Sequence, residues 1–338
     1  MALDILLFAL GLTLAALTLR DVFATVILPG AAHTSLRIAR RLVLVLLPIW
    51  KAVRGRRRAL SGNFAPVVLV GSFVIWMGLL MLGFGLMAYA LRASFDPHLH
   101  NFGEGVYVAG DAIVTIGSGE ASAHGFARAV VVGAGFCGLA VMTMAVTYLL
   151  EVQDSIARRD TSIMKLNTLA GEPPSALALL ERYAAISSQS EVAEALREAR
   201  DWCAVVRQSH AAHPSLIYFR TERTGAGWPA ALGALLDLAL IAEQCLADDA
   251  LYGPAILLRD DGVRVATELA AMVKLKPEAV PTSRSGLREL ADRLAKAGYR
   301  LREDVDFAAL AEQRAQAQSA VAAMAEHLGQ PSTVLVRR

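Results

Sequence analysis

Cysteine is scarce in this chain of 338 residues, and its three copies are Cys137, Cys203 and Cys245. Their spacing matches neither a disulfide framework nor a zinc-ligand pattern. Cys137 falls in an apolar run, and the other two fall in helical segments in which we expect the thiols to stay reduced. The sequence therefore excludes a small disulfide-stabilised fold and gives no indication of a cysteine-based metal centre.

Net charge is also low, at +2 for the whole chain. A surface that attracts nucleic acid needs a large positive excess, so we expect no nucleic-acid partner. No nucleophile–base pair or phosphate-binding loop is recognisable, and no Gly-x-Gly-x-x-Gly motif follows a strand. We therefore expect no enzyme activity, no organic cofactor and no nucleotide-binding regulatory domain.

Charged residues are missing altogether from residues 64–91 and 129–150. Each run is long enough for a helix that crosses a bilayer, which needs about 20 apolar residues. Residues 1–154 hold 19 of the 64 Asp, Glu, Lys and Arg residues, and residues 155–338 hold the other 45. This asymmetry predicts an all-α membrane protein whose lipid-embedded half is followed by a soluble all-α domain.

Three membrane-spanning helices are predicted, at residues 3–28, 64–91 and 126–150. The first can also be read as a signal peptide over Met1 to Leu19. This stretch lacks a basic start and a small-x-small cleavage site, so a retained helix fits it better.

The basic residues predict how these helices are oriented. Between the first and second helices lie Arg37, Arg40, Arg41, Lys51, Arg54, Arg56, Arg57 and Arg58. Only Arg92 and Arg128 stand between the second and third helices, at the margins of that segment. Because cytoplasmic loops carry the positive excess, residues 30–62 are expected inside and residues 92–125 outside. The N-terminus is then outside, and residues 151–338 are cytoplasmic.

Two further apolar stretches each allow a second interpretation. Residues 37–53 are too short to span a bilayer, and their flanking arginines favour an amphipathic helix in the cytoplasmic interface over a re-entrant segment. Residues 230–247 contain Asp237 and Glu243, which favour a buried helix of a soluble bundle over another membrane helix.

A short polar loop, Thr115-Ile116-Gly117-Ser118-Gly119-Glu120, lies between the two charge-free runs. It follows residues 105–114, which can form a helix that crosses half of a bilayer. Glycine adopts backbone conformations closed to other residues, so consecutive carbonyl oxygens can point at one dehydrated cation. Glycine-rich loops are common, and the motif alone is weak. Its place after an outer helix and a half helix, and before an inner helix, favours the lining of a cation pore.

The segment Ala109–Glu120 resembles the pore segment of the bacterial potassium channel family, within the pore-loop cation channel superfamily, which ends Thr-Val-Gly-Tyr-Gly-Asp. Ser118 stands where that family has its aromatic residue. The resemblance covers residues 64–150, and the added first helix and helical tail are similar to those of one bacterial subfamily. The matching positions are Thr115, Gly117, Gly119 and the acid Glu120, with Ile116 in place of valine.

The resemblance implies a two-helix pore module whose selectivity filter is Thr115, Ile116, Gly117, Ser118 and Gly119. Backbone carbonyls of the first four of these, with the Thr115 hydroxyl, would replace the hydration shell of K⁺. It also implies a homotetramer in the bacterial inner membrane, because a closed ring of carbonyls needs several copies of the loop. Permeant K⁺ and the lipid bilayer are the expected ligands, and the sequence names no cytosolic ligand or partner.

Asp111 falls in the middle of the predicted half helix, where an unpaired carboxylate is costly in a membrane. In some channels of the family, an acid at this position sits behind the filter and shares a proton with the acid after the last glycine. The corresponding filter support here is Asp111 with Glu120, which would titrate as one coupled unit. The alternative is a local cap or a hydrated side chain without a part in gating.

Gly133, Gly135 and Gly138 interrupt the bulky inner helix. Gly138 lies near the place of the family's gating hinge, and helices do bend at such weak points. Close packing through small residues is the alternative, which we favour for Gly133 and leave open for Gly138.

The histidines indicate no specific site. His98, His100 and His124 flank the predicted pore on the outside, where we expect solvated side chains rather than pH sensors. His210 and His213 offer two metal ligands on one helix without an evident third.

The expected domains are a first transmembrane helix at 1–29, a basic cytoplasmic linker with an interfacial helix at 30–62, a pore module at 63–151 and a cytosolic helical domain at 152–338. The function implied is passive potassium transport. Because Ser118 replaces the aromatic residue, a non-selective Na⁺/K⁺ channel is one alternative. A non-conducting membrane sensor or scaffold that acts through its cytosolic domain is the alternative from another class.

Overall fold

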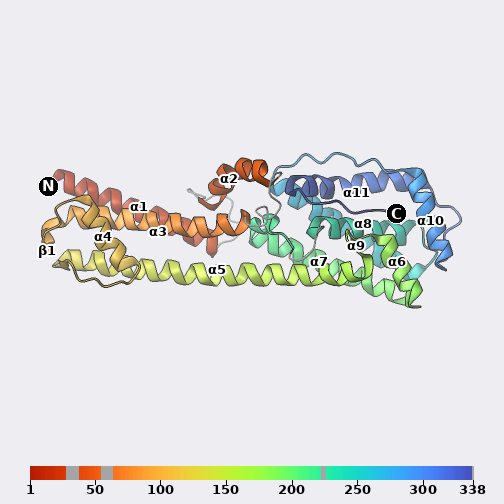
Figure 1. Ribbon diagram of the computed structural model, residues 1–338, viewed down its shortest axis with the longest axis horizontal. Coiled ribbons are helices and arrows are strands. Elements are labelled where there is room, and N and C mark those ends of the chain that lie inside the picture. Colours follow the sequence, from red (N-terminus) through yellow and green to blue (C-terminus); the bar gives the residue numbers. More distant parts are fainter. Residues whose placement is uncertain (28–37, 55–63, 222–225, 337–338) are drawn as a thin grey trace. The chain divides into compact units, whose positions relative to one another are not determined.

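The computed structural model describes residues 1–27, 38–54, 64–221 and 226–336. Over these residues the chain forms eleven α-helices and one small antiparallel sheet of two strands (Figure 1). It divides into two compact units, unit 1 from Met1 to Val152 and unit 2 from Gln153 to Arg338. The expected all-α fold class is thus confirmed at the level of secondary structure.

Unit 1 holds three helices that are long and apolar enough to cross a membrane, α1 (Ala2–Val26), α3 (Phe64–Ala90) and the first part of α5 (Phe126–Ala170). The helix predicted at 126–150 does not end there. No Gly or Pro occurs between residues 139 and 170, so nothing in that stretch breaks the helix. Helix α5 ends where Gly171 adopts a left-handed φ of 74°.

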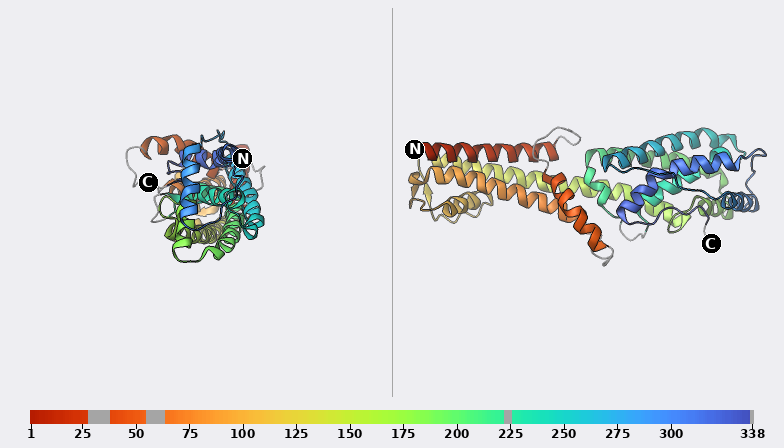
Figure 2. Two further views of the ribbon diagram at one scale, coloured as in Figure 1. Left: turned by 90° about the vertical axis from the view of Figure 1, so that its right-hand side faces the viewer. Right: turned by 90° about the horizontal axis from the view of Figure 1, so that it is seen from above.

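Helices α1 and α3 lie side by side through two glycines that face each other (Figure 2). A Cβ atom on Gly11 would overlap the carbonyl oxygen of Gly83, and one on Gly83 would lie 3.1 Å from the backbone nitrogen of Ala15. Small residues therefore let the two backbones approach closely, as is common between membrane helices.

Polar contacts join α1 to α3 and the residues that follow it, near both ends of α1. The guanidinium of Arg92, just after α3, pairs with the carboxylate of Asp4 in α1. Toward the other end, the indole Nε1 of Trp76 donates to Oδ2 of Asp21 at 2.9 Å, and Asp21 is 2% exposed. These bonds satisfy two carboxylates that would otherwise be costly in an apolar helix pair.

The helix expected over residues 37–53 is present as α2 (Ile38–Arg54). Its Trp50 packs against Phe64 at the start of α3, with ring centroids 5.0 Å apart. Leu44, Val45 and Ile49 remain exposed and form an apolar face. Residues 28–37 and 55–63 of the expected linker lie outside the described residues. The interfacial placement of α2 stays a prediction.

The segment between α3 and α5 contains the small sheet and a short helix. Strand β1 (Phe95–Asp96) pairs with β2 (Ser122–Ala123) in antiparallel register, Phe95 opposite Ala123. Between them along the chain lie α4 (Phe102–Ile113) and the polar loop. Pairing of the two strands therefore brings together the two ends of the segment that contains α4 and the polar loop.

Unit 2 is a helical bundle around α8, of which every residue from Gly227 to Ala242 is buried. Asp237 accepts hydrogen bonds from Arg314 on both of its oxygens, at 2.8 Å each, which explains how a carboxylate is tolerated in this core. Residues 230–244 are thus part of a helix in a bundle, as expected, whereas residues 245–247 of the predicted stretch follow the end of α8. The helices are α6 (Ala176–Ala185), α7 (Val192–Ala212), α8 (Gly227–Gln244), α9 (Asp249–Met272), α10 (Arg284–Lys296) and α11 (Phe307–Leu328), with the end of α5.

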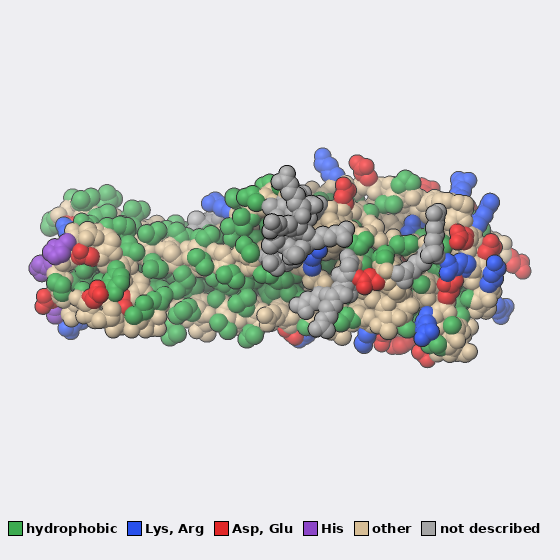
Figure 3. Space-filling model, in the orientation of Figure 1, with side chains coloured by type: hydrophobic (Ala, Val, Ile, Leu, Met, Phe, Trp, Pro, Cys, Tyr) green, Lys and Arg blue, Asp and Glu red, His purple; other side chains and the backbone are tan. Residues whose placement is uncertain are grey.

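The two units differ in the side chains that they expose. Hydrophobic side chains cover most of the visible face of unit 1, whereas Lys, Arg, Asp and Glu side chains gather over unit 2 (Figure 3). This agrees with the uneven distribution of charge along the sequence. The chain therefore has the features of a membrane protein with a polar helical unit.

Candidate functional site

Helix α4 begins at a well-formed cap. The side chain of Asn101 accepts a hydrogen bond from the backbone N–H of Glu104 at 3.1 Å, and the Glu104 carboxylate accepts from the N–H of His100 at 2.7 Å. These bonds satisfy the N–H of Glu104 in the first turn and the N–H of His100 just before the helix. They also explain why α4 starts at Phe102, earlier than the expected residue 105.

Glycines bring α4 close to α3. A Cβ atom on Gly105 would lie 2.8 Å from the carbonyl oxygen of Gly85, and one on Gly85 would lie 2.8 Å from a methyl group of Val106. Ala109 and Ile113 on the same side of α4 are 3% and 0% exposed. Helix α4 is therefore fixed against α3, and the position of its C-terminal end is defined.

The loop that follows α4 has an alternating backbone. Thr115, Gly117 and Gly119 have positive φ angles of 58°, 73° and 70°, whereas Ile116 and Ser118 between them do not. In an ordinary extended strand, successive carbonyl groups point in opposite directions. A reversal of backbone handedness at every second residue lets successive carbonyls point to the same side.

The same loop lies open in the single chain. Every residue from Val114 to Glu120 is exposed, and the Ile116 side chain is 70% exposed. A Cβ atom added to Gly117 or Gly119 would meet nothing within 4 Å. The described part of the chain thus leaves the Ile116 side chain and the backbone of this loop exposed.

Asp111 supports the loop directly. The backbone N–H of Ser118 donates to Oδ1 of Asp111 at 3.0 Å, and the N–H of Ile116 donates to the Asp111 carbonyl oxygen at 3.0 Å. No hydrogen bond or ion pair joins Asp111 to Glu120 in the part of the chain that is described. The single chain therefore does not bring together the pair expected from the sequence, and the Asp111 carboxylate holds the Ser118 backbone instead.

Glycines of α5 contact the end of α4. A Cβ atom on Gly138 would overlap the carbonyl oxygen of Ile113 and lie 2.8 Å from its Cα, and one on Gly135 would lie 3.3 Å from the Ala112 carbonyl oxygen. At Gly133 the nearest atom would be a ring carbon of Phe84, at 3.8 Å, which is an ordinary contact. The geometry therefore supports close packing at Gly138 more than at Gly133.

Another face of α5 is largely exposed over the described part of the chain. Its exposed apolar side chains recur at spacings of three, four and seven residues, so they lie on one side of the helix. Each is more than half exposed. They are Val132, Phe136, Leu139, Val146 and Leu150.

Two features of unit 1 were not expected from the sequence. The bond between Asp21 and Trp76 joins residues 55 positions apart, and the pair of Asp4 and Arg92 joins residues 88 apart. A carboxylate inside a long apolar run was the available signal, because such a group requires a partner. The sequence did not indicate which partner it has.

The histidines are dispersed over both units. His98 has its Nδ1 2.7 Å from the Phe95 carbonyl oxygen, and His210 is fully buried with its Nδ1 2.8 Å from the Val206 carbonyl oxygen. Burial, together with the nearby Arg159 cation, lowers the pKa of His210 to about 3. Among the described residues, no group of three or more His, Cys, Asp or Glu is placed to hold a metal ion.

Comparison with known proteins adds no relative. No protein-family model matches the chain, and neither a curated protein nor a solved structure does. The functional interpretation therefore depends on the geometry of the loop and its supports.

Proposed function

We propose that this chain is one subunit of a tetrameric cation channel in the membrane, and that potassium passes through it along the loop Thr115–Gly119. The alternation of positive and negative φ in a fully exposed loop is the observation that carries the proposal. One chain offers a single row of carbonyl groups. Four copies around an axis would provide the ring of oxygens that replaces the hydration shell of a K⁺ ion.

Exposure of the loop supports assembly around it. Thr115, the β-branched residue that follows the C-cap of α4, has a φ of 58°, which is uncommon for a residue of this type. The open sides of Gly117 and Gly119 leave room for neighbouring copies and ions. The exposed apolar face of α5 offers further surface for lipid or for the other subunits.

The C-terminal end of α4 is also suited to a cation site. The last carbonyl groups of a helix carry a partial negative charge, and α4 ends at Ile113, just before the loop. In a tetramer, four such ends directed at a common cavity would stabilise a cation there. The basic segment between α1 and α3 would then lie in the cytoplasm, with unit 2 on the same side.

Ion flux into liposomes tests this proposal. The purified chain, reconstituted as verified tetramers, is expected to take up ⁸⁶Rb⁺ against trapped K⁺, with block by Ba²⁺. Absence of any monovalent cation flux would reject the channel and favour a non-conducting sensor or scaffold that acts through unit 2. Flux of Na⁺ as large as that of K⁺ would favour the non-selective channel.

The bond between Asp111 and Ser118 gives a pair of variants. We expect Asp111→Ala to reduce the flux about tenfold, because the Ser118 N–H loses an acceptor whose bond to a charged group is worth about 1.5–3 kcal/mol. Asp111→Asn keeps an oxygen at the same place and is expected to retain most of the flux. Equal losses in both variants, measured as ⁸⁶Rb⁺ uptake, would show that the negative charge matters rather than the bond.

Ser118 gives a prediction on selectivity. An aromatic residue there can brace the loop against neighbouring helices, whereas the exposed serine has no such contact. We expect Ser118→Tyr to raise the K⁺/Na⁺ permeability ratio by about tenfold, which corresponds to about 1.4 kcal/mol between the two ions. Ser122→Tyr, also at an exposed serine but outside the loop, is the control. An unchanged bi-ionic reversal potential in Ser118→Tyr would show that the serine does not limit the K⁺/Na⁺ selectivity.

A further inference from the structure

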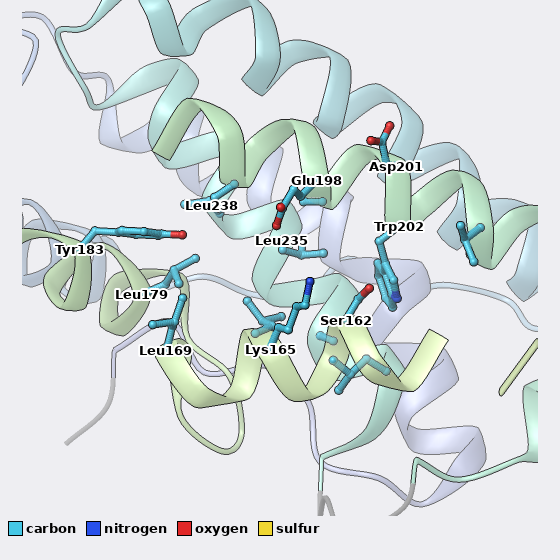
Figure 4. A pocket seen from close by; sticks show the side chains of 16 residues that line it. Ser162, Lys165, Leu169, Leu179, Tyr183, Glu198, Asp201, Trp202, Leu235 and Leu238 are labelled. Carbon is cyan, nitrogen blue, oxygen red and sulfur yellow. The ribbon is translucent and has the colours of Figure 1, made fainter. Parts of the chain in front are cut away.

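Unit 2 contains an open cavity of about 340 Å³ between the C-terminal part of α5 and helices α6, α7 and α8 (Figure 4). Its volume lies in the range of small-molecule sites. Leu179, Leu235 and Leu238 form an apolar floor and are 3%, 7% and 1% exposed. The cavity is therefore a candidate ligand site on the helix that also follows the loop of unit 1.

Three charged residues line this cavity, Lys165, Glu198 and Asp201, and the carboxylate of Asp201 points away from it (Figure 4). The side chains of Lys165 on α5 and Glu198 on α7 point toward one another across it (Figure 4). Over the described part of the chain, neither has an ion pair or a hydrogen bond. By contrast, Arg200 and Arg207 on the same helix α7 pair with carboxylates of α9 at 2.6 and 2.7 Å. Lys165 and Glu198 are both exposed, so the open cavity presents a cation and an anion that are unpaired among the described residues, whereas Arg200 and Arg207 nearby are paired.

Further polar groups are placed at the edge of the floor. The Tyr183 hydroxyl points into the cavity from α6 (Figure 4), and burial, with Glu191 and Glu198 nearby, raises the pKa of Tyr183. Its phenol therefore stays neutral and can donate a hydrogen bond. Trp202 uses its Nε1 to donate to the Arg159 carbonyl oxygen at 3.0 Å, so it presents its ring to the cavity and not its N–H.

We propose that this cavity binds a small zwitterion with an apolar side chain, of the α-amino acid class. The carboxylate would pair with Lys165, the ammonium group with Glu198, and the side chain would rest on the leucine floor. A simple anion would leave Glu198 close to its own charge, and an uncharged apolar molecule would cover both charges without a partner. A zwitterion alone satisfies both groups and the floor together.

Calorimetric titration of the full purified chain tests the proposal with matched probes. L-leucine and L-phenylalanine are expected to bind with a Kd between about 10 μM and 1 mM. 3-Methylbutylamine, which is leucine without its carboxylate, and 4-methylpentanoate, which is leucine without its ammonium group, are expected to bind at least about fivefold more weakly. No binding of either amino acid up to about 10 mM would overturn the proposal.

Substitutions of Lys165 and Glu198 test which charged group of the ligand each side chain binds. Lys165→Met and Glu198→Gln are each expected to weaken leucine binding about fivefold, because each removes one charged partner. Lys165→Met should leave the binding of 3-methylbutylamine unchanged. Lys276→Met, at an exposed lysine outside the cavity, is the control. Leucine binding that survives both cavity variants would overturn the proposal. These titrations read binding alone, so their result is independent of whether the chain conducts cations.

Discussion

Gly117→Ala is expected to abolish cation flux while the protein still folds and assembles. Gly117 has a φ of 73°, a conformation that costs a residue with a Cβ atom about 1–2 kcal/mol. The alanine would meet no other atom, so the strain is relieved by rotation of the neighbouring peptide groups, which turns a carbonyl away from the ion path. Summed over four copies, the cost of the conducting backbone is about 4–8 kcal/mol, enough to reduce ⁸⁶Rb⁺ uptake by more than about a hundredfold.

Gly125 supplies a matched control for this variant. It has a positive φ of 53°, and a Cβ atom there would also meet nothing within 4 Å, but it lies outside the loop at the start of α5. Gly125→Ala should carry a similar backbone strain and retain its flux. Normal flux in Gly117→Ala would contradict the assignment of the ion path. Equal loss in both variants would indicate a general effect of strain on folding.

Gly138→Ala is expected to destabilise the protein and to reduce the flux. Its new methyl group would overlap the carbonyl oxygen of Ile113, which is fully buried at the end of α4. Relief requires α4 and α5 to separate, at a cost of about 1–3 kcal/mol, which outweighs the gain of up to about 1 kcal/mol from better helix propensity. The separation would also displace Asp111, which holds the loop. Thermal unfolding in detergent and ⁸⁶Rb⁺ uptake measure the two effects.

Gly133→Ala is the control that distinguishes close packing at Gly138 from a hinge at Gly138. Gly133→Ala gains only an ordinary contact with Phe84, so we expect it to raise the free energy of unfolding by up to about 1 kcal/mol. If Gly138 served as a hinge without close packing, Gly138→Ala would stabilise the helix in the same way. A higher unfolding temperature in Gly138→Ala than in the unmodified protein would therefore contradict the packing interpretation.

The apolar helices were predictable because membrane spans follow a one-dimensional rule. Residues 64–91 lack charge, and α3 occupies 64–90. The same rule missed the true end of α5, since hydropathy falls after residue 150 while helix propensity does not. The polar residues of 151–170 change the surroundings of the helix and leave its backbone hydrogen bonds intact.

The contacts at the loop were less predictable, because they depend on three-dimensional proximity. A carboxylate in the half helix indicated that Asp111 has a partner, and the family resemblance suggested Glu120. In the single chain, the Asp111 carboxylate accepts a hydrogen bond from the backbone N–H of Ser118 instead. Every residue except proline has a backbone N–H, so no pattern of residue types could have indicated which one donates to Asp111. The cavity of unit 2 is similar, since Lys165 and Glu198 face each other only after four helices have packed.

The most direct test of the account is the reversal potential of the unmodified protein in a planar bilayer with unequal KCl on the two sides. A channel lined by carbonyl oxygens excludes anions, so we expect discrete currents that reverse at the equilibrium potential of K⁺. A current that reverses at the Cl⁻ potential, or no current from verified tetramers, would contradict the claim that the loop Thr115–Gly119 is a cation filter.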